Sequence, residues 1–522
     1  MRVPSSAVAA VLAAIAACAS SPEGDPDDLE VVPPGKADNY YSNVAAELEV
    51  SGTIPVTLTA EEYADEVIRG DRVSRRLTAV GLYLTTFLTD KFRGIDINGD
   101  GEITEDEVFF RNESYGGFHA MVRNYSVEAL EVIGDATQGY SVRFTIDVAG
   151  PRDFLSKLVG VEGQTFDLQM PLGATIDPAN VPRGEIRKFD PSTYQGEIET
   201  VRCEVRPLPV PANAYPHYAD FVADGVYDIT LLYGHDYNKA RSDLRESREA
   251  WDTLEELGFN MPAPSFEDLG ATSGPAVLEA RAGGRDVRME VRIFNSEMFV
   301  GDRQKQHDLA LEELTTRDVF FYNGHAGPYF GFYLDAERVA TVNYWELAEA
   351  PFTGKQQLAI AQGCQTYSQY ADMLYASPEK SEDDLDVITT VNFSYGRGTM
   401  GIVRNLIRVD AQRNHQPVDF YRIVSDLNYE WLNSYRSVFY GVMGVDGNPQ
   451  LHPYASAASI GQECAAPSDC GDPSGNVCLA EESGPKRCGA VALAETACPA
   501  GSRYRLTAAG GTIQGGACLP GE

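Results

Sequence analysis

Residues 319–327 read Val-Phe-Phe-Tyr-Asn-Gly-His-Ala-Gly, and residues 358–365 read Leu-Ala-Ile-Ala-Gln-Gly-Cys-Gln. Each stretch begins with four apolar residues, which is typical of a strand buried on both faces of a sheet. Each then reaches a glycine followed by one reactive side chain, His325 or Cys364. Because the carboxyl ends of parallel strands meet at one edge of a sheet, we expect His325 and Cys364 to lie within reach of each other.

Apolar strands and amphipathic helices alternate on both sides of these stretches, between about residues 215 and 455. We expect strands at 226–233, 287–294, 319–322, 357–361 and 387–391, and helices at 238–257, 303–314, 344–350, 399–413 and 417–433. Helices that connect parallel strands cover both faces of the sheet. Residues 215–455 are therefore predicted to form a three-layer α/β domain with a mostly parallel sheet.

The segments that flank this domain have different patterns. Residues 39–214 contain short stretches of β-branched and aromatic residues punctuated by Pro and Gly, which predict a β-rich, sandwich-like domain. Residues 460–522 are rich in Gly and hold six cysteines: Cys464, Cys470, Cys478, Cys488, Cys498 and Cys518. An even number of cysteines in an exported tail predicts a small disulfide-rich module, with the pairing left open. A zinc site is a weaker alternative, because the tail has no CxxC pair.

The first 17 residues predict a signal for export. Arg2 is followed by an apolar run over residues 7–17, which is too short to span a bilayer as a stable helix. The run leads into Cys18 through small residues, and this resembles the bacterial lipobox, in which the cysteine is lipidated. We therefore expect a signal peptide over 1–17, lipidation of Cys18, a flexible tether over 18–38, and anchoring in the cell envelope, at the outer membrane, periplasm or cell surface. Secretion with Cys18 inside the removed peptide is the alternative.

The charge of the chain narrows the range of partners. The 522 residues carry a formal net charge of −35, and the acidic residues are spread along the sequence. A field of this sign repels nucleic acid and anionic lipid surfaces, so we expect no nucleic-acid partner and a membrane contact only through the lipid anchor.

Residues 96–107 read Asp-Ile-Asn-Gly-Asp-Gly-Glu-Ile-Thr-Glu-Asp-Glu, which fits the EF-hand calcium loop. The predicted ligands are Asp96, Asn98, Asp100, Glu102 through its carbonyl, Thr104 and Glu107. Only one such loop is present, and calcium outside the cytoplasm is abundant, so we expect a structural Ca²⁺ ion rather than a sensor. An acidic loop without metal is the alternative, and no organic cofactor is expected.

A histidine beside a cysteine suits acyl transfer through a thiol. The thiolate is the nucleophile, and the imidazole removes the thiol proton and later protonates the leaving amine. The oxyanion of the tetrahedral intermediate needs donors, for which the backbone N–H groups of Cys364, Ala326 and Gly327 are candidates.

An apolar strand that ends in His-Gly, followed by an apolar strand that ends in a small residue and Cys, resembles the caspase, gingipain, legumain, clostripain and separase clan of cysteine peptidases. The resemblance covers residues 215–455 and implies a caspase-like domain with His325 as general base and Cys364 as nucleophile. Two positions depart from the pattern. Ala326 stands where the family usually has Gly, and Gly363 stands where it often has Ala.

The resemblance also implies residues that line the pocket for the cleaved side chain. Gln362 precedes the nucleophile by two positions, Ser394 lies with Phe393 and Tyr395 on the following strand, and His235 ends another strand. Arg397 would favour an acidic substrate and the acidic surface a basic one, so no specificity is predicted beyond a protein or peptide.

Competing interpretations remain open at the level of sequence. Cys364 is alternatively a buried structural thiol or the disulfide partner of Cys203, and His325 a turn residue. The chain would then be a non-catalytic, calcium-binding surface protein on an inactive caspase-like scaffold. A serine hydrolase and a zincin are disfavoured, because the sequence contains neither GxSxG nor HExxH.

Overall fold

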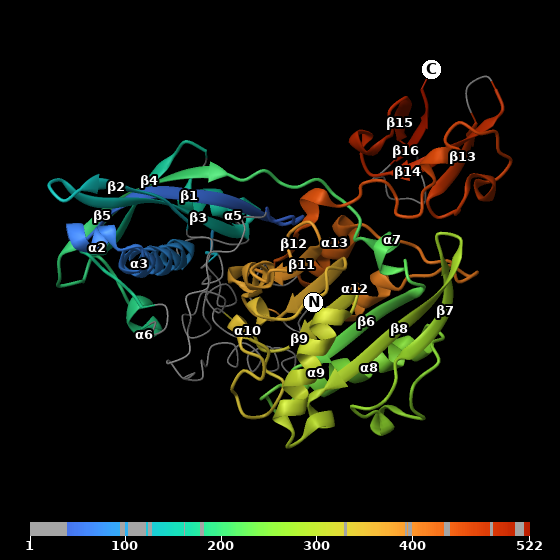
Figure 1. Cartoon of the computed structure of the whole chain (residues 1–522), viewed down its shortest axis with the longest axis horizontal. Coiled ribbons are helices and arrows are strands. Elements are labelled where there is room, and N and C mark those ends of the chain that lie inside the picture. Colours follow the sequence, from blue (N-terminus) through green and yellow to red (C-terminus); the bar gives the residue numbers. More distant parts are fainter. Residues whose placement is uncertain are drawn as a thin grey trace.

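The protein is described from a computed structural model that contains three separate β-sheets (Figure 1). The residues it describes are 39–93, 100–102, 122–123, 128–160, 162–177, 182–327, 331–391, 394, 399–432, 439–480, 484–506 and 516–521. The expected signal peptide (1–17), Cys18 and the tether (18–38) lie outside these residues. Within the described part of the chain, no helix is both long and apolar enough to cross a membrane.

The N-terminal sheet is antiparallel and has the strand order β2-β3-β1-β5-β4. Its strands are β1 (Ala45–Val56), β2 (Glu128–Asp135), β3 (Gly139–Pro151), β4 (Thr165–Pro171) and β5 (Ile198–Pro207). The long helix α3 (Glu66–Arg93) lies along the sheet (Figure 1).

Helix α3 packs on this sheet through one apolar stripe. Its fully buried side chains recur at three- and four-residue spacing: Val73, Leu77, Val80, Leu84 and Leu88. They belong to the same hydrophobic cluster as Val50 and Ile54 of β1. The expected sandwich is therefore wrong, because an amphipathic helix forms the second layer in place of a second sheet.

The central sheet has seven strands in the order β12-β11-β10-β9-β6-β8-β7. These are β6 (Val226–Tyr233), β7 (Ala276–Ala282), β8 (Arg285–Asn295), β9 (Val319–Asn323), β10 (Gln357–Gln362), β11 (Leu385–Thr390) and β12 (Tyr440–Met443). Strands β8, β6, β9, β10 and β11 run parallel, and the two edge strands β7 and β12 are antiparallel to their neighbours. The prediction of a mostly parallel sheet is confirmed.

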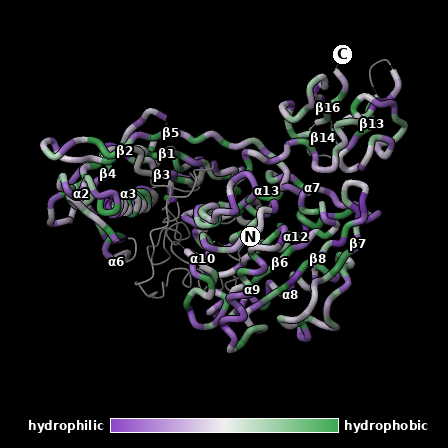
Figure 2. The backbone as a smooth tube through the Cα atoms, viewed as in Figure 1, coloured by the Kyte–Doolittle hydropathy of each residue, from purple (hydrophilic) through white to green (hydrophobic). Residues whose placement is uncertain are grey.

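Helices cover both faces of the central sheet. They are α8 (Ser242–Glu256), α9 (Arg303–Thr316), α10 (Tyr344–Ala348), α11 (Tyr370–Tyr375), α12 (Thr399–Leu406) and α13 (Phe420–Leu432). Phe321 of β9 shares a cluster with apolar residues of α8, α12 and α13, whereas its neighbour Phe320 shares one with residues of α9, α10 and α11. Strand β6 is mostly hydrophobic in Figure 2, whereas charged residues alternate with hydrophobic ones along most of β8.

The strand order reverses at β6. The chain leaves β6 for β7 and β8 on one side and then returns to β9 on the other side. In open α/β sheets, binding sites form outside the carboxyl ends of the strands at such a switch point. The fold therefore directs attention to the residues that follow β6, β9 and β10.

The N-terminal domain packs against the central domain through a buried polar network. The guanidinium of Arg123 is fully buried and forms a bidentate pair with Asp372 of α11. Tyr367 donates a hydrogen bond of 2.5 Å to Glu47 of β1. The short helix α7 (Tyr218–Phe221) lies between β5 and β6 in the chain.

The C-terminal module is a small four-stranded sheet, drawn in red in Figure 1. Its strands are β13 (Asn476–Ala480), β14 (Lys486–Ala492), β15 (Ser502–Leu506) and β16 (Gly516–Pro520). A backbone bridge between Leu451 and Ala492 joins the module to the segment that follows the central domain.

Candidate active site

Three parallel strands of the central sheet end side by side. Tyr233 of β6 pairs with Asn323 of β9, and Asn323 pairs with Gln362 of β10. His325 follows β9 by two positions, and Cys364 follows β10 by two positions. As the sequence predicted, β9 and β10 are parallel neighbours and bring the histidine and the cysteine to the same edge of the sheet.

The backbones of these strand ends are in close contact around Gly363. A Cβ atom added at Gly363 would collide with the Cβ atom of Ala326 and would lie 3.0 Å from the carbonyl oxygen of Gly324. The methyl group of Ala326 thus occupies the space that a side chain before the cysteine would need. Ala326 and Gly363, the two departures from the expected sequence pattern, are therefore linked. The methyl group of Ala326, after β9, takes the space that the side chain of an alanine at position 363, after β10, would occupy.

Asp236 lies beside the imidazole of His325. The Oδ1 atom of Asp236 is 3.8 Å from the Nε2 atom of His325, an ion-pair distance rather than a hydrogen bond. The carboxylate accepts hydrogen bonds from the backbone and side chain of both Asn238 and Ser242, at 2.5–2.9 Å. Burial raises the pKa of Asp236, but the neighbouring imidazole and these hydrogen bonds outweigh burial and hold the pKa below its ordinary value.

The ring of His325 is also held on one face. The ring of Tyr237 stacks on it with centroids 4.9 Å apart and planes 10° apart. The guanidinium of Arg338 lies 4.9 Å from the centroid of the Tyr237 ring. Stacking and the cation–π contact restrict rotation of the imidazole.

Asp236 and Tyr237 are the site residues that sequence reasoning missed. The sequence does carry a signal for them. Residues 234–237 read Gly-His-Asp-Tyr directly after β6, so a third strand ends in Gly-His at the same edge. The strand-end pattern points to His235 in this stretch, whereas the structure places Asp236 and Tyr237 beside His325.

Cys364 is buried, with 3 % of its surface exposed. Its sulfur lies 3.9 Å from the carbonyl oxygen of Ser394. Cys203 is a free, buried thiol in β5, so the expected alternative of a Cys203–Cys364 disulfide is wrong.

The segment after β9 offers backbone donors for an oxyanion. The hydroxyl of Tyr322 donates a hydrogen bond of 2.6 Å to the carbonyl oxygen of His325, which fixes the start of this segment. Ala326 and Gly327 are buried. Burial raises the pKa of Tyr370, and a hydrogen bond from the backbone N–H of Gly327 opposes this effect, so that N–H already has an acceptor. Their role as oxyanion donors stays a prediction.

The expected pocket residues have different surroundings. Gln362 is 1 % exposed and donates a hydrogen bond of 3.2 Å to the hydroxyl of Tyr440, so its side chain belongs to the core rather than to an open wall. The Oγ atom of Ser394 lies 3.3 Å from the same hydroxyl. The Nδ1 atom of His235 lies 3.2 Å from the Oγ atom of Ser296, and burial lowers the pKa of this histidine. Phe393, Tyr395 and Arg397 lie outside the described residues.

The calcium loop is described only at its centre. The backbone N–H of Glu102 donates a hydrogen bond of 2.8 Å to Oδ1 of Asp100, and Gly101 between them has φ of +90°. This left-handed conformation agrees with the sharp turn that the sixth position of an EF-hand loop requires. The other expected ligands, Asp96, Asn98, Thr104 and Glu107, lie outside the described residues, so the ion itself stays a prediction.

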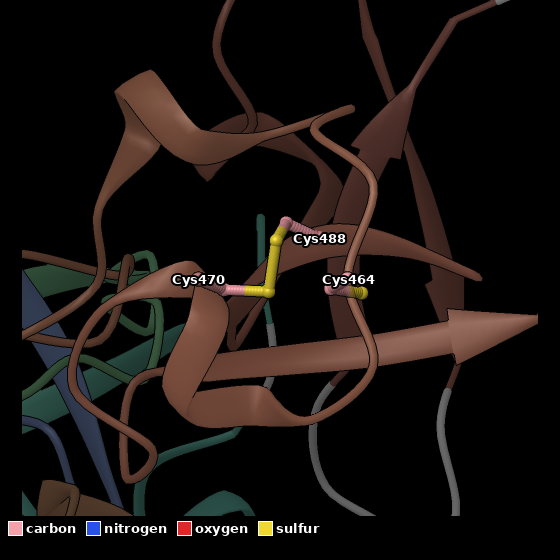
Figure 3. Close-up of side chains that lie close together, drawn as sticks. All are labelled: Cys464, Cys470 and Cys488. Carbon is pink, nitrogen blue, oxygen red and sulfur yellow. A yellow bond between two sulfur atoms is a disulfide. The ribbon is translucent and has the colours of Figure 1, made fainter. Parts of the chain in front are cut away.

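The cysteines of the tail form three disulfides, Cys464–Cys478, Cys470–Cys488 and Cys498–Cys518. The sulfurs of Cys464, Cys470 and Cys488 lie within 4.8 Å of one another (Figure 3). Zinc binds thiolates, and each of these sulfurs is already bonded to another sulfur. The prediction of a disulfide framework is confirmed, and the zinc alternative is wrong.

Comparisons of this chain with protein-family models, with curated proteins and with solved structures give no match. The residues at the strand ends and the chemistry that they permit therefore provide the basis for a proposed function.

Proposed function

We propose that this chain is an exported, lipid-anchored cysteine endopeptidase with a structural calcium ion and a caspase-like central domain. The observation that carries the proposal is that three chemically suited residues follow neighbouring strands at the switch point of the sheet. Asp236, His325 and Cys364 follow the adjacent parallel strands β6, β9 and β10. This set supplies a nucleophile, a general base and a group that orients the base.

The roles follow from the geometry around His325. Asp236 faces the Nε2 atom, and the Tyr237 ring covers one face of the imidazole. The Nδ1 atom is then the nitrogen that takes the thiol proton of Cys364. The negative charge of Asp236 stabilises the imidazolium that results.

The reaction consists of two acyl transfers. The thiolate of Cys364 attacks the carbonyl carbon of the peptide bond, and the N–H groups of Ala326 and Gly327 donate to the oxyanion. The C–N bond then breaks as His325 protonates the leaving amine, which leaves a thioester on Cys364. His325 next removes a proton from water, and the hydroxide attacks the thioester to release the acid and the thiolate.

The test is cleavage of a mixed peptide library by the full chain with dithiothreitol present, read by mass spectrometry. The Cys364→Ala variant should lose all turnover. The Cys203→Ala variant, which receives the same reductant and loses a buried thiol of the other domain, should keep it. Cleavage by the Cys364→Ala variant at the wild-type rate would refute the mechanism.

A second candidate function is calcium-dependent surface binding on an inactive caspase-like scaffold. The burial of Cys364 favours this alternative. It predicts that iodoacetamide leaves Cys364 unlabelled in the reduced native protein and that no library peptide is cleaved. Rapid labelling at Cys364, blocked by a peptide aldehyde, would instead support the peptidase.

A further inference from the structure

A cavity of about 310 Å³ lies between the ends of α8, α12 and α13 and strand β7. Leu278 of β7 lines it and pairs with Met289 of β8, which pairs in turn with Tyr227 at the start of β6. The cavity therefore lies at the amino-terminal edge of the parallel strands. The candidate active site lies at the opposite edge, so the two sites share no residue.

The floor of the cavity is apolar. Five of the side chains that line it are hydrophobic: Leu257, Phe259, Leu278, Ile407 and Val409. Phe259, Leu278 and Ile407 are buried, whereas Leu257 and Val409 are partly exposed and would be covered by an apolar body in the cavity.

Three arginines surround this floor, in a chain whose net charge is −35. Arg404 forms an ion pair of 3.2 Å with Glu256, and Arg422 forms one of 3.0 Å with Asp426. Arg408 is exposed and has no carboxylate partner among the described residues. The guanidinium of Arg408 is therefore the one at the rim of the cavity whose charge no paired carboxylate neutralises.

We propose that this cavity binds a small organic anion with an apolar body and one carboxylate or sulfonate group. The apolar body would lie over Leu257 and Val409. The anionic group would meet the guanidinium of Arg408, whose planar donors suit an oxyanion. An inorganic anion would leave the floor exposed, and a neutral apolar molecule would leave Arg408 unused.

The experiment compares two fluorescent probes that share one body. 8-Anilinonaphthalene-1-sulfonate carries a sulfonate, and N-phenyl-1-naphthylamine lacks it. The full chain is titrated with each probe at low and high salt. The anionic probe should saturate at one site and bind more tightly than the neutral probe, and added salt should weaken only the anionic probe.

Two variants and one control connect the binding to this cavity. Arg408→Gln should weaken the anionic probe about three- to tenfold and leave the neutral probe unchanged. Val409→Trp should fill the cavity and abolish binding of both probes with the arginines in place. Arg505→Gln removes an exposed arginine of the C-terminal module and should change neither. Unchanged anionic binding in both Arg408→Gln and Val409→Trp, or absence of saturable binding to the wild type, would overturn the proposal.

Discussion

The Nε2 atom of His325 lies 3.8 Å from the Oδ1 atom of Asp236 and has no hydrogen-bond partner in the described part of the chain. A carboxylate at this position orients the imidazole and stabilises its protonated form. Asp236→Asn keeps the shape of the side chain and removes the charge. For the proposed peptidase activity, we expect kcat to fall on the order of tenfold to a hundredfold, with KM little changed.

The protein contains a matched control for this substitution. His307 of α9 lies 3.0 Å from Asp308, away from the strand ends. Asp308→Asn removes a carboxylate beside a histidine in the same way and should leave kcat unchanged. Equal kcat values for the wild type and Asp236→Asn would remove Asp236 from the proposed mechanism.

A double-mutant cycle can test whether side chains at positions 326 and 363 compete for the same space. Gly363→Ala alone places a Cβ atom against Ala326 and should destabilise the protein by about 1–3 kcal/mol. Combining it with Ala326→Gly should recover most of this loss, with a coupling energy of about 0.5–3 kcal/mol. Urea denaturation of the wild type, the two single variants and the double variant gives the free energy of unfolding of each protein.

Gly354→Ala is the control for this cycle, because a Cβ atom at Gly354 has no neighbour within 4 Å. It should change stability little and should be additive with Ala326→Gly. If Gly363→Ala and Ala326→Gly are also additive, the two residues do not compete for one space.

The buried pair of Arg123 and Asp372 joins two domains and should matter to stability. Arg123→Met removes the guanidinium and leaves the Asp372 carboxylate buried without a cation. We expect a loss of about 3–5 kcal/mol in the free energy of unfolding. Arg202→Met breaks the exposed pair of Arg202 with Asp167, at 2.9 Å, and should cost at most about 1 kcal/mol. A loss of the same size from both variants would contradict the argument.

The same network should make stability depend on pH. Burial and the neighbouring Glu47 raise the pKa of Asp147 to about 8, against the opposing effect of Arg123. The folded state then holds a proton that the unfolded state releases above pH of about 4. Stability should therefore fall as the pH rises from about 4 to about 8, by at most about 1.4 kcal/mol per pH unit.

Asp147→Asn mimics the protonated carboxyl group and should flatten this dependence. The free energy of unfolding in urea, measured at several pH values between 5 and 8, gives the slope for each protein. Glu204→Gln changes an exposed carboxylate of β5 and should keep the wild-type slope. If stability falls more steeply with pH in Asp147→Asn than in the wild type, the pKa of Asp147 is not raised in the folded state.

Calcium should stabilise the chain through the loop at residues 96–107. Chelation with EGTA should lower the melting temperature, because an ion that binds only the folded state adds about 2.7 kcal/mol at a hundredfold excess over Kd. Asp100→Ala should abolish this difference. Asp135→Ala, in the exposed turn between β2 and β3, should retain it, and calorimetric titration should show one site per chain.

The strands that enclose the candidate site could be predicted because they are buried on both faces. A run such as 319–322 is apolar at every position, and that signal does not depend on the rest of the fold. The edge strands β7 and β12 were missed for the opposite reason. Strand β7 alternates apolar and charged residues, and β12 has only four residues, one of them glycine.

The sequence patterns could not predict which side chains of the candidate site contact one another. Asp236 reaches His325 because the loop after β6 turns back over the end of β9, and the register between those strands sets that distance. Helix α3 was missed because its residues 66–76 contain four arginines, which obscured an apolar stripe that is clear only at helical spacing. Sequence spacing predicted which strands carry reactive groups but not which groups meet.

Tyr440 connects the N-terminal domain to the wall of the candidate site. Its carbonyl oxygen accepts a hydrogen bond of 2.7 Å from the hydroxyl of Ser42, while its phenol contacts Gln362 and Ser394. A fragment that begins at residue 215 would lose Ser42 and leave β12 without its outer partner. Proteolytic trimming of the first domain would therefore release Tyr440 from its hydrogen bond with Ser42 without touching His325 or Cys364.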